Sequence, residues 1–141
     1  MARIFGTVLI LAGCAGFLYK WAEGEKARQR MAEEWIRLFV RWGYALEQEH
    51  VRLYDFLSFY ETADASMQAF LDEVCVCMRN HQNPSGQKIW QDCLQKHKSK
   101  LQIGQEGWEI LTSAAGAFYG ESSAENLRCN EICRKRMEKF L

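Results

Sequence analysis

The stretch from residue 31 to residue 46, MAEEWIRLFVRWGYAL, carries its largest apolar side chains three and four residues apart. Side chains at these spacings lie on one side of an α-helix, because the helix turns once in about 3.6 residues. Charged residues fill the opposite side. The pattern predicts a long amphipathic helix over residues 23–49 with one face against a protein core. That face consists of Met31, Trp35, Leu38, Trp42 and Ala45.

Apolar spacings of three and four also mark the rest of the chain, and only one of its 141 residues is proline, the residue that helix interiors tolerate least. We therefore expect an all-α body, an antiparallel helix bundle. Further helices are expected over residues 51–60, from a cap at Ser66, around Trp90 after the turn at 80–86, around Trp108 up to Gly120, and from a capping box at residues 122–125 to the chain end. The predicted bundle core contains Trp35, Leu38, Trp42, Phe70, Trp90, Trp108 and Leu111.

The amino-terminal segment contains no charged residue from Ile4 to Tyr19. Extended to Ala22, with Trp21 as an interfacial anchor, it has a helical length of about 28 Å, close to the roughly 30 Å thickness of the hydrocarbon core of a bilayer. We predict a transmembrane anchor in residues 1–22 and a helical bundle in residues 23–141. The anchor residues expected to contact membrane lipid are Ile4, Phe5, Val8, Leu9, Ile10, Leu11, Phe17, Leu18, Tyr19 and Trp21.

Basic residues are distributed unevenly around this segment. Arg3 precedes it, whereas six basic residues from Lys20 to Arg41 lie at or after its end. The positive-inside rule then places the body in the cytoplasm, where thiols stay reduced. Two alternatives stay open: a cleaved secretory signal, and a lipobox at residues 11–14 that would lipidate Cys14.

Composition and motifs argue against several function classes. The 18 basic and 18 acidic residues balance, so no net field attracts nucleic acid. The sequence has no phosphate-binding loop, zinc-protease motif or triad spacing, and we expect no enzyme, no catalytic residue and no cofactor.

The six cysteines leave one alternative function, a redox or metal-binding membrane protein. Cys129 and Cys133, four residues apart, share a helix face, but zinc needs about four ligands. The others would come from Cys75 or Cys77, Cys93 or a histidine. Since buried cysteines are common as small apolar residues, we assign no metal site from the sequence.

Two stretches, RIFGTVLILAGCAGFLYKWAEGEKARQR at residues 3–30 and IWQDCLQKHKSKLQIGQEGWEILTSAAGAFYGESSAENL at residues 89–127, resemble the stage III sporulation protein AB family. The resemblance implies a scaffold subunit, without catalytic residues, of a secretion-like channel between mother cell and forespore that is required for endospore formation. It also implies a bundle resembling the cytoplasmic domain of the type II secretion platform protein.

The resemblance further implies a location in the mother-cell membrane around the forespore. The expected partners are membrane lipid, a secretion-type ATPase resembling stage III sporulation protein AA, other channel subunits and further copies of this chain. The family ends in a second apolar span, which residues 138–141, EKFL, do not provide, and this leaves the carboxy-terminal topology open.

Overall fold

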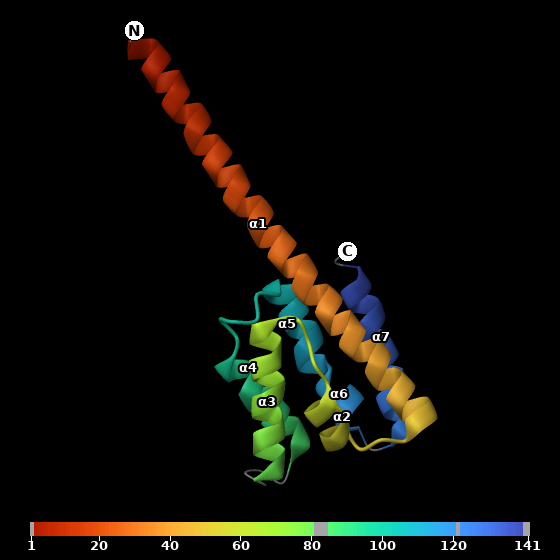
Figure 1. The fold of residues 1–141 in the computed structure, drawn as a ribbon. Coiled ribbons are helices and arrows are strands. Elements are labelled where there is room, and N and C mark those ends of the chain that lie inside the picture. Colours follow the sequence, from red (N-terminus) through yellow and green to blue (C-terminus); the bar gives the residue numbers. More distant parts are fainter. Residues whose placement is uncertain (1, 81–84, 121, 140–141) are drawn as a thin grey trace.

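A computed structural model describes residues 2–80, 85–120 and 122–139, and these residues form an all-α fold without strands (Figure 1). The all-α part of the predicted fold class is therefore confirmed. In chain order the elements are α1 (Ala2–Tyr44), a π-helical turn (Ala45–Glu49), α2 (Leu53–Phe59), α3 (Ala65–Arg79), α4 (Gly86–Lys96), α5 (Gly104–Ser113), α6 (Ala115–Phe118) and α7 (Ser123–Glu138).

α1 is one helix of 43 residues that continues through residues 22 and 23 without a break. Its amino-terminal half projects beyond the other helices, and its carboxy-terminal half packs against α7 (Figure 1). The face predicted from the spacing at residues 31–45 is buried in the bundle. The π-helical turn ends at Glu49, and the next residue, His50, has a backbone φ of 51°, in the left-handed region.

Aromatic rings from four helices meet in the centre of the bundle. The ring of Trp35 in α1 lies 5.9 Å from Phe70 of α3 and 6.0 Å from Trp90 of α4, centroid to centroid. Phe118 of α6 lies 4.8 Å from Trp90. Tilted and edge-on contacts of this kind are favourable beyond the apolar area that they bury. Of the predicted core residues, Trp35, Leu38, Trp42, Phe70, Trp90 and Leu111 are buried here.

Trp108 was predicted to lie in the core, but it does not. It is only partly buried at the edge of the core, and Lys98 Nζ lies 5.0 Å from the centroid of its ring. The reason is the phase of α5, whose buried face carries Gly107, Ile110 and Leu111. Trp108 is displaced from that face by about 100° relative to its neighbour Gly107.

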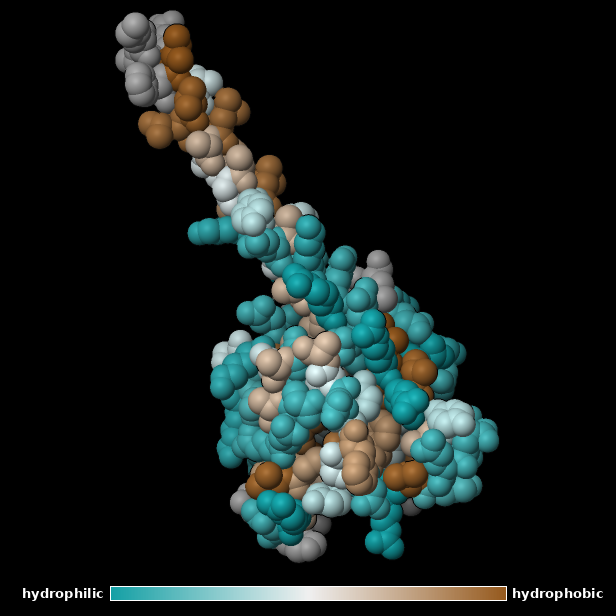
Figure 2. Space-filling model, viewed as in Figure 1, coloured by the Kyte–Doolittle hydropathy of each residue, from teal (hydrophilic) through white to brown (hydrophobic). Residues whose placement is uncertain are grey.

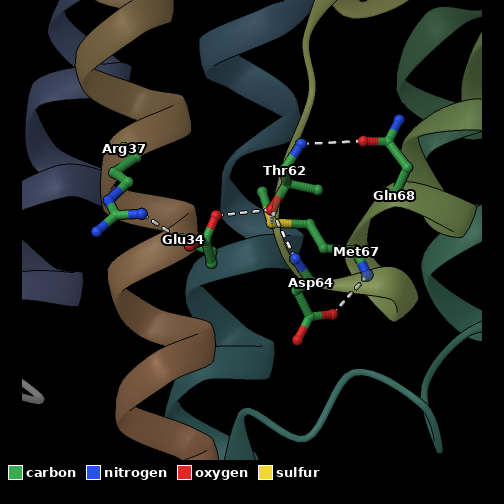
Figure 3. Close-up of polar contacts among 6 residues, drawn as sticks. All are labelled: Glu34, Arg37, Thr62, Asp64, Met67 and Gln68. Carbon is green, nitrogen blue, oxygen red and sulfur yellow. Dashed lines mark hydrogen bonds and ion pairs between the residues drawn. The ribbon is translucent and has the colours of Figure 1, made fainter.

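The amino-terminal cap of α3 also differs from the prediction. Asp64 is the cap, and its Oδ1 accepts a hydrogen bond of 2.9 Å from the Met67 backbone N–H (Figure 3). Ser66 lies inside the first turn of the helix. Aspartate and serine are about equally frequent caps, so residue type alone could not separate the two positions.

Thr62 attaches the segment before α3 to α1 (Figure 3). Its hydroxyl donates to Glu34 Oε2 at 2.7 Å and accepts the Asp64 backbone N–H at 3.3 Å. Its own backbone N–H donates to Gln68 Oε1 at 3.0 Å. These contacts fix the start of α3 relative to α1.

The boundaries of the last helices are close to the predicted ones. Ser122 accepts the Glu125 backbone N–H at 3.2 Å, which confirms one of the two hydrogen bonds of the expected capping box. The single helix expected around Trp108 up to Gly120 is divided at Ala114 into α5 and α6, and α6 ends at Phe118, two residues before Gly120. In the predicted turn at 80–86, residues 81–84 lie outside the described residues.

Candidate functional site

The amino-terminal section of α1 is an exposed apolar surface. The large apolar side chains described between Ile4 and Trp21 are 57–71% exposed, and Figure 2 shows them along the projecting helix. Of the predicted anchor residues, those in this state are Ile4, Val8, Leu9, Ile10, Leu11, Phe17, Leu18, Tyr19 and Trp21. The side chain of Phe5 lies outside the described part of the chain.

Among the described residues, no helix combines the length and the hydropathy of a membrane span. This finding does not support the predicted transmembrane anchor.

A hollow of about 360 Å³ opens on the surface where α1 and α2 meet. Its lining includes Tyr44, Phe56, Phe59 and Tyr60, with charged groups among them such as Arg41 and Asp55. Phe59 is 86% exposed, an unusual state for a side chain of this size. Aromatic side chains and arginine are enriched on surfaces that bind other proteins.

The structure separates the cysteines of the body into two groups. Cys129 and Cys133 lie on α7, where Cys129 Sγ is 3.6 Å from the Ser113 carbonyl oxygen and Cys133 Sγ is 4.0 Å from that of Ile110. Cys77 of α3 and Cys93 of α4 lie together elsewhere. The sequence left open a zinc site in which other cysteines join Cys129 and Cys133. In the structure Cys77 and Cys93 instead lie near Glu73, apart from the two cysteines of α7.

Around Cys77 and Cys93 the structure brings together two residues of α3, one of α4 and the residue that caps the end of α4. Ligand atoms of Glu73, Cys77 and Cys93 all lie within 4.8 Å of one another. Glu73 Oε2 contacts His97 Nε2, and Glu73 Oε1 accepts a hydrogen bond of 3.2 Å from Lys96 Nζ. We call Glu73, Cys77, Cys93 and His97 the α3–α4 cluster.

The electrostatics of this cluster differ between its groups. Burial, together with the neighbouring Cys77 thiol and Glu73 carboxylate, raises the pKa of Cys93 to about 12, so its thiol is protonated at neutral pH. Burial also acts to raise the pKa of Glu73, but hydrogen bonds from His97 and Lys96 outweigh it and the pKa is lowered. A carboxylate therefore lies beside a neutral thiol.

Glu73 is a member of the cluster that the sequence motifs did not single out. The spacing that could have revealed it is visible in the sequence, because Glu73 and Cys77, like Cys93 and His97, are four residues apart and so share a helix face. What the spacing does not give is the packing of α3 on α4, which brings the two pairs together.

These features define a class: a small all-α protein whose longest helix joins an exposed apolar section to a buried bundle face. A family model described as stage III sporulation protein AB matches residues 3–141. The chain belongs to this family, in agreement with the resemblance of its two stretches, and its role is in sporulation. Comparison with curated proteins and with solved structures gave no match.

Proposed function

We propose that this chain is a non-enzymatic scaffold subunit, anchored in the mother-cell membrane, of a secretion-like channel that serves the forespore. The observation that carries the proposal is the division of α1, whose amino-terminal section exposes apolar side chains while its carboxy-terminal section forms the centre of the bundle. One continuous helix therefore connects an exposed apolar surface, whose contact with water is unfavourable, to the folded bundle. Membership of the sporulation family supplies the context.

Lipid is the proposed cover for the amino-terminal section. The segment from Ile4 to Tyr19 is uncharged, and its exposed side chains would lose contact with water in a bilayer. The excess of basic residues after this segment favours a cytoplasmic body.

The anchor is tested by carbonate extraction of membranes from cells that make the full chain. We expect the chain to stay in the membrane pellet, and Ile10→Arg to release it, because an arginine near the centre of a span costs about 2.5 to 3.5 kcal/mol on insertion scales. Ile10→Leu is the control and should stay in the pellet. Extraction of the unchanged chain would contradict the anchor, and retention of Ile10→Arg would show that this section is not what holds it.

For the partner we propose the surface hollow at α1 and α2 as the contact with a secretion-type ATPase resembling stage III sporulation protein AA. Phe59 is highly exposed, so its removal should alter binding without altering the core. Buried aromatic anchors often carry much of the binding energy of an interface. Other channel subunits and further copies of this chain would complete the assembly.

The contact is tested by co-purification of the full chain with the ATPase. We expect Phe59→Asp to lose the ATPase while its circular dichroism stays unchanged. Ile132→Asp, at an exposed position on α7, is the matched control and should retain it. Equal retention by both variants would place the contact elsewhere, and no retention by the unchanged chain would remove the proposed partner.

A further inference from the structure

We propose that the α3–α4 cluster is a binding site for one thiophilic divalent cation, of which Zn²⁺ is the typical example. The proposal is independent of the scaffold function. Three ligand atoms from Glu73, Cys77 and Cys93 already lie within 4.8 Å of one another, and His97 contacts the carboxylate. Two thiolates, a carboxylate and an imidazole form a ligand set that zinc accepts.

The arrangement of these residues follows from helix geometry. Each side of the cluster contributes a pair four residues apart: Glu73 and Cys77 on α3, and Cys93 on α4 with His97, the residue that caps the end of α4. Such pairs project from one face, and two faces that pack together can surround an ion placed between them. Metal sites in helical bundles are built in this way, from side chains on facing helices.

The distances are compatible with closure around an ion. Zinc holds sulfur at about 2.3 Å and oxygen at about 2.0 to 2.2 Å, which puts neighbouring ligand atoms of a tetrahedral site roughly 3.3 to 3.8 Å apart. The three atoms of the cluster thus need to approach one another by roughly 1 to 1.5 Å at most, which side-chain rotation can supply. Binding would release the thiol protons, as is general for cysteine ligands.

His97 and Lys96 have different roles in this proposal. His97 is buried, and apart from its contact with Glu73 its second ring nitrogen, Nδ1, finds no hydrogen-bond partner among the described residues. Its position allows it either to orient the Glu73 carboxylate or to become the fourth ligand. The ammonium of Lys96 is at the exposed end of a flexible side chain and can leave Glu73 when an ion enters.

The test is a metal titration of the full chain, purified in detergent, reduced and freed of metal without oxygen. We expect one Co²⁺ to bind with the visible and near-ultraviolet absorption of tetrahedral thiolate coordination, and Zn²⁺ to displace it. Glu73→Gln and Cys77→Ser should each weaken binding at least about tenfold. The double variant Cys129→Ser with Cys133→Ser is the matched control and should bind like the unchanged chain.

A second measurement keeps the test decisive if a cysteine variant fails to fold. Glu73 is 28% exposed at its side chain, so Glu73→Gln should fold. Zn²⁺ should raise the melting temperature of the unchanged chain more than that of Glu73→Gln, because a ligand stabilises only the state that binds it. Absence of a thiolate–cobalt band, equal binding by Glu73→Gln, loss of binding in the control, or a Cys77–Cys93 disulfide in the reduced preparation would each overturn the proposal.

Discussion

Asn130 Nδ2 donates a hydrogen bond of 2.8 Å to the backbone carbonyl oxygen of Phe39, a residue 91 positions earlier in the chain. Both residues are buried, and the bond joins α7 to α1. A Cβ atom at Gly43 would lie 2.9 Å from the same nitrogen, so the absence of a side chain at Gly43 is what allows this contact. The last helix is thus fixed to the first by a polar contact inside an apolar interface.

Removing this contact should destabilise the bundle. Asn130→Ala deletes a buried hydrogen bond, and we expect a loss of about 1 to 2 kcal/mol in the free energy of unfolding. Arg128→Ala, on the exposed side of α7, is the control and should change the stability by no more than about 0.5 kcal/mol. Chemical denaturation monitored by circular dichroism measures both. Equal effects would show that the contact contributes nothing.

The two central tryptophans should differ in their response to phenylalanine. Trp90 Nε1 donates to the Leu111 carbonyl oxygen at 2.8 Å, whereas Trp35 Nε1 is buried and finds no acceptor among the described residues. Trp90→Phe loses a hydrogen bond and Trp35→Phe loses none, so we expect Trp90→Phe to cost about 1 kcal/mol more. Denaturant midpoints of the two variants provide the comparison. The reverse order would contradict the assignment of these hydrogen bonds.

Truncation of Trp35 gives a larger effect and tests the buried face of α1. Trp35→Ala should lower the free energy of unfolding by roughly 3 to 5 kcal/mol, through lost burial and the cavity that remains. Arg37, whose side chain is 67% exposed, forms an ion pair with Glu34, and Arg37→Ala should cost no more than about 0.5 kcal/mol. Thermal or denaturant unfolding distinguishes the two, and similar small losses would mean that Trp35 is not in the core.

The cap of α3 can be located by two alanine substitutions. Asp64→Ala removes the acceptor for the Met67 N–H and should cost about 1 kcal/mol, the usual loss for a helix cap. Ser66→Ala lies within the first turn and should change the stability by no more than about 0.5 kcal/mol. If Ser66→Ala were the more damaging of the two, the cap would be the one expected from the sequence.

Cys133 should be inert to thiol reagents while the protein is folded. Burial, and to a smaller extent the neighbouring Cys129 thiol, raises the pKa of Cys133 to about 12. The thiolate is the reactive form, so at pH 8 only about one thiol in ten thousand is reactive. A pulse of maleimide followed by mass spectrometry should find Cys133 unlabelled in the folded chain and labelled after denaturation. Rapid labelling of the folded chain would contradict the burial of this thiol.

The fold was largely predictable because burial follows apolar spacing along each helix. The face of Trp35, Leu38 and Trp42 could be identified from the sequence, since the helix period alone sets it. The position of Trp108 could not, because it depends on how α5 is rotated against its neighbours. The cap at Asp64 likewise depends on a segment held by Thr62, a contact between parts of the chain far apart in sequence.

The sequence gives the two residue pairs of the α3–α4 cluster but not their proximity. The spacing of Cys93 and His97 is evident, and so is that of Glu73 and Cys77. The packing of the helices decides which of these pairs lie close together. The pair Cys129 and Cys133 has the same spacing, so the sequence could not exclude it. The membrane anchor was predicted from the uncharged segment at residues 4–19 and the distribution of basic residues, and the hydropathy of the described helices does not support it.

The continuity of α1 has a mechanical consequence. A helix of 43 residues is about 64 Å long, and each residue along it turns the chain by about 100°. No break separates the two sections of α1. The number of residues between the sections therefore sets the angle by which the body is rotated about the helix axis relative to the amino-terminal section. One residue inserted near Gly24 would turn the body by about 100° and shift it by about 1.5 Å. Copies held by their amino-terminal sections in one orientation would therefore all turn the same side of the body toward their neighbours.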